Sequence, residues 1–265
     1  MKNYISADIE GVTGVTHWDE TDLQKADMAA SREQMTAEVV AACEGALQAG
    51  ATEIWVKDAH DTGRNLIASR LPHEVRLIRG WSGHPWLMVQ ELDETFHAAM
   101  FVGYHSRAGS NSSPLAHTMT GALSRVLLNG RFASEYLLHT YVAAYLKVPV
   151  VFVSGDKGLC EEATQFNSNI RSVAVKEGIG NSTVSIHPEL AVSMIRDGVE
   201  KALQGNVAQC QVALPVHFTL DILYRDHTKA LLYGYFPGAQ QIDSHTVRFE
   251  SDSYFEVMRF LLFAA

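Results

Sequence analysis

Asp8 and Glu10 stand two positions apart near the start of the chain, directly after an apolar segment at residues 3–7. In extended chain, residues two apart point to the same side, so the two carboxylates lie together. Adjacent carboxylates repel each other unless a proton or a cation separates them. The pair is therefore a candidate cation site, and the alternative that stays open is an ordinary solvated edge of a sheet.

Further groups that bind metals follow later apolar runs or begin a predicted helix. They are Asp58 with His60, then His105, His117 and Glu135. Zinc accepts imidazole nitrogen and carboxylate oxygen, and two-metal hydrolytic sites hold their ions about 3.5–4 Å apart. Together with the first pair, these groups could hold two divalent ions, with Asp8 as the candidate bridging ligand. Taken singly, each histidine is equally consistent with a loop residue, and Glu135 with a glutamate stabilised by the helix dipole.

The segments that must position these groups alternate between short apolar runs and helical patterns. Strands are expected at residues 3–7, 53–57, 75–78, 98–104 and 148–154, with helices ending near Gly50 and spanning 135–146. The run at 98–104 is almost wholly apolar, which is typical of a strand covered on both faces. This alternation predicts an α/β fold, a mostly parallel sheet flanked by helices. Ligands bind such sheets outside the carboxyl ends of the strands, where the candidate ligands stand.

The second half of the chain has a different texture. Asn129-Gly130 separates two short apolar runs and predicts a type I′ hairpin, so we expect a mixed sheet. A helix at 188–204, strands at 212–220 and 246–250 and a C-terminal helix follow. We expect residues 1–180 to form a metal-binding catalytic α/β domain and residues 181–265 a second, smaller α/β lobe.

Composition excludes several classes of partner. The 265 residues carry 30 acidic and 21 basic side chains, a formal charge of -9 that disfavours nucleic acid and anionic membrane as partners. No apolar run approaches the ~20 residues that span a bilayer. The three cysteines are widely spaced, and Asp8 interrupts any signal-peptide core. We therefore expect a cytoplasmic protein.

Other catalytic motifs are missing. The glycines and serine between Gly103 and Gly109 do not have the GxSxG spacing, and Gly11–Gly14 lacks the GxGxxG spacing of a dinucleotide site. No phosphate-binding P-loop is present. Cys160, at an expected helix start, fits a small buried cysteine better than a nucleophile.

Five motifs in order closely resemble the zinc-dependent D-aminopeptidases, peptidase family M55. They are Tyr4-x-Ser6-x-Asp8-x-Glu10-Gly11, Asp58-x-His60, Gly103-Tyr104-His105, His117-x-Met119 and Glu135. The resemblance implies one zinc held by Asp8, Glu10 and His105, and a second held by Asp8, His60 and Glu135. It matches His117 to the family's catalytic histidine and gives supporting roles to Asp58, Asn65 and Arg107. One departure is Ser134, where the family pattern has glycine.

The resemblance also implies an activity and an assembly. Family members form large ring-like homo-oligomers, expected to be decamers, and release N-terminal residues, notably D-alanine, from short peptides. In the expected metal-assisted amide hydrolysis, His117 passes a proton to the leaving amine, and a nucleophilic role for it stays open. Mn²⁺ or Co²⁺ in place of the two Zn²⁺ also stays open.

Two other functions remain as alternatives at this point. The same ligand types serve a two-metal phosphoesterase. A non-catalytic cytosolic peptide-binding protein could hold a structural metal, but structural zinc sites are normally closed by four protein ligands. Three ligands per ion, one of them shared, fit a catalytic site better.

Overall fold

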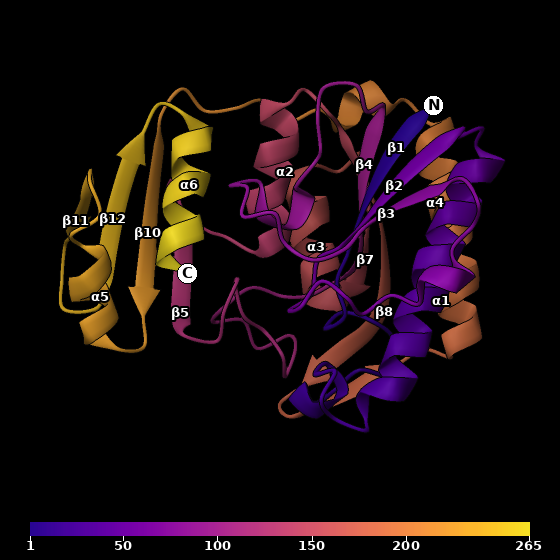
Figure 1. Cartoon of the computed structure of the whole chain (residues 1–265), viewed down its shortest axis with the longest axis horizontal. Coiled ribbons are helices and arrows are strands. Elements are labelled where there is room, and N and C mark those ends of the chain that lie inside the picture. The colour runs from indigo at the N-terminus through magenta and orange to yellow at the C-terminus, as the bar shows by residue number, and fades with distance from the viewer.

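The computed structural model describes residues 1–265 and contains two β-sheets with helices packed on them (Figure 1). The larger sheet has seven strands in the order β3-β2-β1-β4-β7-β8-β9. Their bounds are β1 Lys2–Ala7, β2 Glu53–Asp58, β3 Val75–Ile78, β4 Ala98–Tyr104, β7 Val150–Asp156, β8 Arg171–Ile179 and β9 Ser182–Ser185. All neighbours pair in parallel except β8 and β9, which confirms the expected mixed, mostly parallel sheet.

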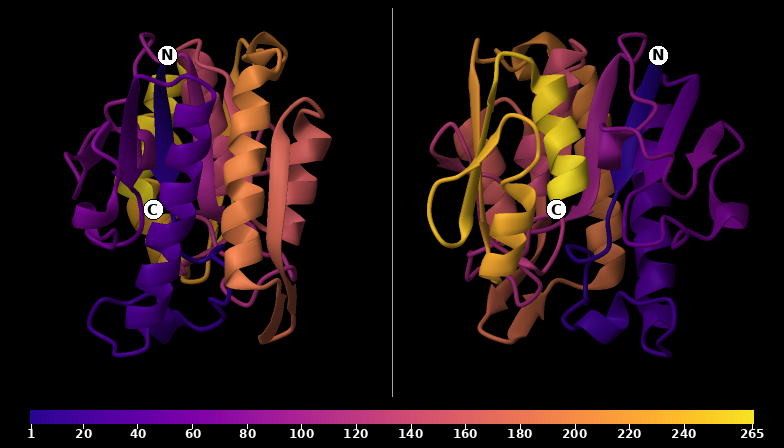
Figure 2. Two further views of the ribbon diagram at one scale, coloured as in Figure 1. Left: turned by 90° about the vertical axis from the view of Figure 1, so that its right-hand side faces the viewer. Right: turned by 60° about the vertical axis from the view of Figure 1, so that its left-hand side comes forward.

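Helices cover both faces of this sheet. α1 (Met28–Gln48) and α4 (Pro188–Gln204) pack side by side (Figure 2), whereas α2 (Glu135–Tyr145) and α3 (Lys157–Phe166) pack against β7 and neighbouring strands. Right-handed crossovers place α1 and the α2–α3 pair on opposite faces, because β1 leads to β2 in one direction along the sheet and β4 leads to β7 and β8 in the other. Short 3-10 helices η1 to η4 lie at Trp18–Glu20, Ala68–Arg70, Leu87–Val89 and Val207–Cys210. None of the helices combines the length and apolar composition that crossing a membrane requires.

The smaller sheet is antiparallel, with strand order β11-β12-β10-β5-β6. Its strands are β5 Leu123–Leu128, β6 Arg131–Phe132, β10 Phe218–Tyr224, β11 Ala239–Gln241 and β12 Thr246–Ser251, accompanied by α5 (His227–Tyr233) and α6 (Tyr254–Ala264). Asn129 and Gly130 both have positive φ, 52° and 76°, so the hairpin turn predicted at this dipeptide is confirmed.

Three features differ from the expectations. The division near residue 180 does not separate the two sheets, because β5 pairs with β10 of the smaller sheet and α4 packs on α1 of the larger layer. The strand expected at 212–220 lies at Phe218–Tyr224 instead, since Pro215 lacks the N–H that a strand pairing requires. The β8–β9 hairpin was not expected, because charged residues such as Lys176 and Glu177 interrupt its apolar pattern.

Candidate metal centre

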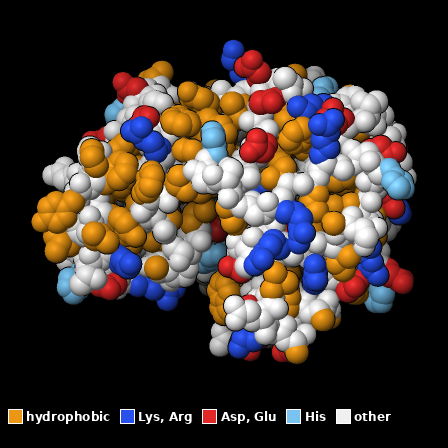
Figure 3. Space-filling view, in the orientation of Figure 1, with side chains coloured by type: hydrophobic (Ala, Val, Ile, Leu, Met, Phe, Trp, Pro, Cys, Tyr) orange, Lys and Arg blue, Asp and Glu red, His pale blue; other side chains and the backbone are white.

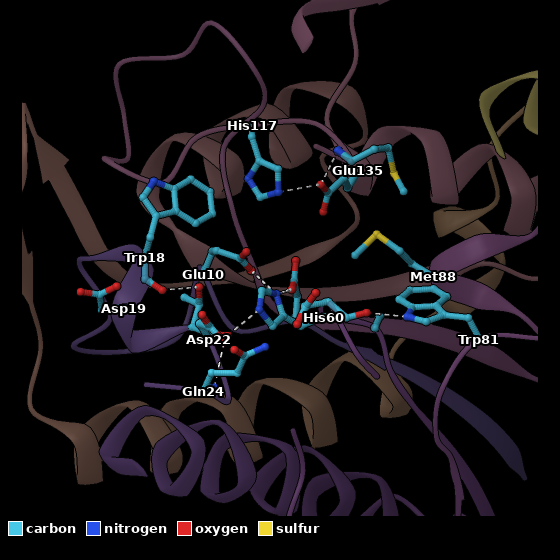
Figure 4. Close-up of a pocket in the computed structure, with 15 residues that line it drawn as sticks. Glu10, Trp18, Asp19, Asp22, Gln24, His60, Trp81, Met88, His117 and Glu135 are labelled. Atoms are coloured by element: carbon cyan, nitrogen blue, oxygen red, sulfur yellow. Dashed lines mark hydrogen bonds and ion pairs between the residues drawn. The ribbon is translucent and has the colours of Figure 1, made fainter. Parts of the chain in front are cut away.

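The candidate ligands meet at the carboxyl ends of three neighbouring strands. Asp8 and Glu10 follow β1, His60 follows β2 and His105 follows β4, and these strands are adjacent in the sheet. Glu135 is the first residue of α2. Asp8, Glu10, His60 and Glu135 line a cavity of about 660 Å³, in which Figure 4 shows the last three, and His105 is buried next to Asp8 and Glu135. The sequence prediction that these groups come together is thus matched by their positions.

Asp8 lies at the centre of two groups of ligands. Its Oδ1 is 3.3 Å from His60 Nδ1, and its Oδ2 is 3.5 Å from His105 Nε2. Glu10 Oε2 lies 3.0 Å from the same His60 nitrogen, and Glu135 Oε2 lies 3.2 Å from the same His105 nitrogen. The structure therefore groups Asp8 with Glu10 and His60, and Asp8 with His105 and Glu135. The two histidines are exchanged relative to the implied sets, while Asp8 is common to both groups, as expected. A third group at the same spacing, without Asp8, joins Glu10, His105 and His117.

The hydrogen bonds of the histidines define which nitrogen faces the carboxylates. His60 Nε2, His105 Nδ1 and His117 Nδ1 lie 2.8, 2.9 and 2.9 Å from backbone carbonyl oxygens. A carbonyl oxygen only accepts hydrogen bonds, so each of these nitrogens carries a proton. In a neutral imidazole the other nitrogen then presents a lone pair. In all three residues that other nitrogen faces a carboxylate oxygen.

Lone pairs that face carboxylates require a positive charge between them, supplied by a proton on the imidazole or by a metal ion. Asp8 Oδ2, Glu10 Oε2 and His105 Nε2 are moreover buried without a hydrogen-bond partner, which is costly unless a further group satisfies them. Histidines that bind metals usually donate their other ring N–H to a carbonyl or carboxylate, as these do. The donor set of imidazole nitrogen and carboxylate oxygen is one that zinc accepts. These residues could therefore hold two divalent ions.

The pKa shifts within the cluster also indicate a site that favours positive charge. Burial would lower the pKa of His105, but Glu135, Glu10 and Asp8 overcome burial and raise it to about 10. Burial would raise the pKa of Glu135, but His105 and His117 lower it to about 2. Burial and the nearby Glu10 hold the pKa of Asp8 well above its usual range. The cluster thus favours added positive charge, which metal ions supply in exchange for protons.

His117 lies in the loop between β4 and β5 and lines the cavity. Its ring stacks on that of His105, with centroids 4.3 Å apart and planes 8° apart, and Trp18 meets it edge-on at 5.3 Å. Its Nε2 is 3.5 Å from Glu135 Oε1 (Figure 4), the oxygen that also accepts the Met119 N–H at 2.6 Å. The imidazole is therefore held on two sides, with Nε2 as the nitrogen free to exchange a proton.

The loop that carries Glu10 packs directly on the end of β4. The N–H of Gly11 donates to the Gly103 carbonyl at 2.8 Å, and a Cβ on Gly11 would lie only 1.7 Å from the Tyr104 carbonyl oxygen. Glycine is therefore required at position 11, because any side chain would push Glu10 away from His105.

The comparisons agree with this geometry. The family model of the D-aminopeptidases, Peptidase_M55, matches residues 1–263. The chain belongs to the D-aminopeptidases of peptidase family M55. A D-aminopeptidase of Bacillus subtilis (strain 168) is 32% identical over 264 residues, covering 99% of this chain and 96% of the relative. The solved structure of the Zn-dependent D-aminopeptidase DppA from Bacillus subtilis, described as a self-compartmentalizing protease, superposes with a TM-score of 0.94 at 30% identity, covering 100% of this chain and 96% of that one.

Two of the three supporting positions expected from the D-aminopeptidase motifs lie beside the centre. Asp58 accepts the backbone N–H of Asn65 at 2.5 Å and its side-chain amide at 2.8 Å. Asn65 in turn donates to the His60 carbonyl at 2.7 Å, so the pair shapes the loop that carries this histidine. Arg107 does not line the cavity. It lies over the Phe132 ring at 4.0 Å, on the far side of its loop.

Ser134, at the position where the sequence resemblance led us to expect glycine, caps α2. Its hydroxyl accepts the Leu137 N–H at 3.1 Å and donates to Glu162 at 2.6 Å. A serine cap of this kind stabilises the first turn of the helix that presents Glu135.

Apart from Met119 of the His117-x-Met119 motif, the walls of the cavity were not identified from the sequence. Its other lining residues include Trp18, Trp81 and Met88, with Asp19, Asp22 and Asp61 among the acidic ones. They come from separate loops and share no spacing, so only the fold of the D-aminopeptidase family could reveal them.

Proposed function

We propose that this protein is a metal-dependent aminopeptidase that removes the N-terminal residue of short peptides with two zinc ions per chain. The observation that carries the proposal is the pair of carboxylate–histidine groups that share Asp8 at the base of a cavity. Family membership supports the same conclusion. Asp8 would bind both ions, with Glu10 and His60 on one side and His105 and Glu135 on the other.

Each protein group has a role that follows from its position. Bound zinc would supply Lewis acidity, which makes a peptide carbonyl more electrophilic and water more acidic. His117 Nε2 would pass a proton to the leaving amine, because its Nδ1 is engaged by the Leu115 carbonyl. Trp18 and His105 hold the imidazole in that orientation. Asp58 and Asn65 keep the His60 loop in place.

We further propose that the N-terminal residue is a D-amino acid, with D-alanine as the first candidate. The support is the D-aminopeptidase activity named for both relatives. The acidic residues Asp19, Asp22 and Asp61 line the cavity and suit the α-ammonium group of a peptide. A free amine requirement of this kind gives aminopeptidase rather than endopeptidase action.

The test is a chiral pair of substrates with and without metal. Purified protein should release alanine from D-alanyl-D-alanine, lose this activity after chelation and recover it with zinc. L-alanyl-L-alanine and bis(p-nitrophenyl) phosphate serve as comparison substrates. Release from the phosphodiester alone would contradict the proposal, and faster cleavage of the L-dipeptide would contradict its D-specific part.

We also propose that the chain assembles into a ring-like homo-oligomer, a decamer. The related DppA is described as self-compartmentalizing. Hydrophobic side chains gather on the left of Figure 3, over α5, β11 and β12, where a surface depression is lined by Leu232, Tyr233, Tyr235, Phe236 and Phe263. Exposed apolar patches of this kind are typical of contact surfaces between chains.

Light scattering tests the assembly. Wild-type protein should elute as a particle of about ten chain masses. Leu232→Asp should give smaller species, whereas Val216→Asp, at an apolar residue 89% exposed elsewhere, should not. A monomeric wild type would contradict the assembly.

The three cysteines are all unpaired and buried, which supports the expected reducing, cytoplasmic location.

A further inference from the structure

Lys176 is a buried lysine that neither the motifs nor the metal-binding groups include. It lies in β8, and only 3% of the residue is exposed to solvent. Its Nζ donates hydrogen bonds to the carbonyl oxygens of Glu10 and Val15. Both carbonyls belong to the loop between β1 and η1, and Glu10 is 166 residues away from Lys176 in sequence. One ammonium group therefore holds this distant loop near the residue that carries the proposed ligand carboxylate.

Burial of an ammonium group is costly, and the surroundings of Lys176 offset that cost. Its Nζ lies within hydrogen-bond distance of two carbonyl oxygens, which only accept hydrogen bonds, so the amine donates to both. A buried lysine is retained where its charge and donors are used, and two of the three donors go to this one loop.

The same loop is also held by Glu38 of α1. The N–H of Thr13 donates to Glu38 Oε1 at 3.0 Å, and the Gln34 amide supports that carboxylate at 3.0 Å. Lys176 and Glu38 thus hold the loop that carries Glu10 at different backbone groups, the carbonyls of Glu10 and Val15 and the N–H of Thr13. Without the lysine, the carbonyls of Glu10 and Val15 would be left buried with no donor.

Asp156, the neighbour of Lys176 in the sheet, holds the loop that carries a second proposed ligand, His105. Asp156 of β7 pairs with Lys176 in the sheet and accepts the Ser106 N–H at 2.6 Å and the Ser106 hydroxyl at 2.5 Å. Ser106 directly follows His105. Two adjacent positions of the sheet therefore hold the two loops from which Glu10 and His105 reach the metal centre.

We propose that Lys176 is a positioning residue for the metal centre: by holding the Glu10 and Val15 carbonyls, it keeps the Glu10 carboxylate where it binds metal together with Asp8. This inference rests on the metal centre proposed above. It assigns Lys176 no contact with the substrate. Groups that orient metal ligands from outside typically contribute about 10–100-fold to metal affinity.

The experiment compares zinc affinities measured by competition with a chromogenic chelator. Lys176→Met keeps the length of the side chain and removes its charge and donors, and we expect it to bind zinc about 10–100-fold more weakly than wild type. Lys157→Met, at an exposed lysine of α3, should match wild type. Ile222→Ala, in the core of the smaller sheet, controls for a general loss of stability.

The outcomes separate this inference from the proposed function. Weak zinc binding by Lys176→Met, with normal binding by Ile222→Ala at a similar melting temperature, supports the positioning role. Equal affinity in wild type and Lys176→Met overturns the role of Lys176 and leaves the proposed function intact. Failure of the wild type to bind zinc contradicts the proposed function itself. Lys176→Gln, which keeps a shorter donor without charge, gives the same comparison where the Met variant does not fold.

Discussion

His105 and His117 stack face to face, 4.3 Å apart and within 8° of parallel, and each directs its Nε2 at a different oxygen of Glu135. A proposed metal ligand and the proposed proton carrier therefore share one carboxylate. The orientation of the Glu135 side chain therefore affects both metal binding and the position of His117, because the same carboxylate contacts His105 and His117.

His117→Ala should lose most of its turnover while it still binds zinc. General acid–base groups contribute about 10²–10⁴-fold to rate, and the five proposed ligands do not include His117. The measurement is kcat on D-alanyl-D-alanine together with zinc content. His227→Ala, at an exposed histidine of α5, is the matched control. Full activity in His117→Ala would remove this residue from the mechanism.

Trp18→Ala should lower kcat with little change in zinc affinity. The indole edge closes the open side of the His117 ring at 5.3 Å, and a misplaced catalytic group costs up to about 10²-fold in rate. Trp18→Phe keeps an aromatic edge and should recover most of the rate. Similar kcat values for the Ala variant and wild type would show that His105 alone holds the imidazole.

Ser134→Ala should destabilise the protein by about 1 kcal/mol, because the N-cap of α2 is lost. Ser134→Gly should cost only a few tenths of a kcal/mol, because glycine is tolerated at the N-cap better than alanine. Calorimetric melting temperatures of the two variants check the order. A Gly variant less stable than the Ala variant would contradict the expected order, because both variants lose the hydroxyl that donates to Glu162 and differ only at the cap.

The protein should lose stability as the pH rises above about 10, and Tyr254 should contribute to that loss. Burial, with Tyr141 nearby, raises the pKa of Tyr254 well above its usual value, whereas an unfolded tyrosine ionises near about 10. Above that pH the unfolded chain binds fewer protons than the folded one, so the free energy of unfolding falls with pH.

Tyr254→Phe tests this assignment. The variant lacks the hydroxyl that donates to the Leu138 carbonyl at 2.7 Å, so its melting temperature should be lower at pH 8 by the equivalent of about 1 kcal/mol. Between pH 9.5 and 11 its melting temperature should fall less steeply than that of wild type. Identical slopes would show that other buried groups account for the alkaline instability.

The ligands could be predicted from sequence because their positions follow from simple rules. Asp8, Glu10, His60 and His105 stand where apolar runs end, and parallel strands bring their carboxyl ends to one edge. The positions of all four, and of Glu135 at the start of α2, follow that expectation. Which histidine lies with which carboxylate depends on side-chain rotamers, and spacing carries no information on them.

Other features depend on contacts that sequence patterns do not encode. Lys176 interrupts an apolar run, and nothing in the sequence shows that it is buried with its Nζ on the carbonyl oxygens of the distant residues Glu10 and Val15. α4 has an amphipathic pattern that predicts a helix, but the pattern does not say which layer receives its apolar face. The cavity walls, such as Trp18 and Trp81, come from loops that only the complete fold brings together.

The most direct test of the proposed function is the zinc content per chain of wild type and of Asp8→Asn. Both proteins are produced in zinc-supplemented medium, purified without chelator and desalted before the measurement. Asp8 belongs to both ligand groups, so its loss should affect both ions. The account predicts two zinc ions per wild-type chain and a marked reduction in Asp8→Asn. A wild-type content near zero, with no gain on addition of zinc, would contradict the binuclear centre and the peptidase mechanism built on it.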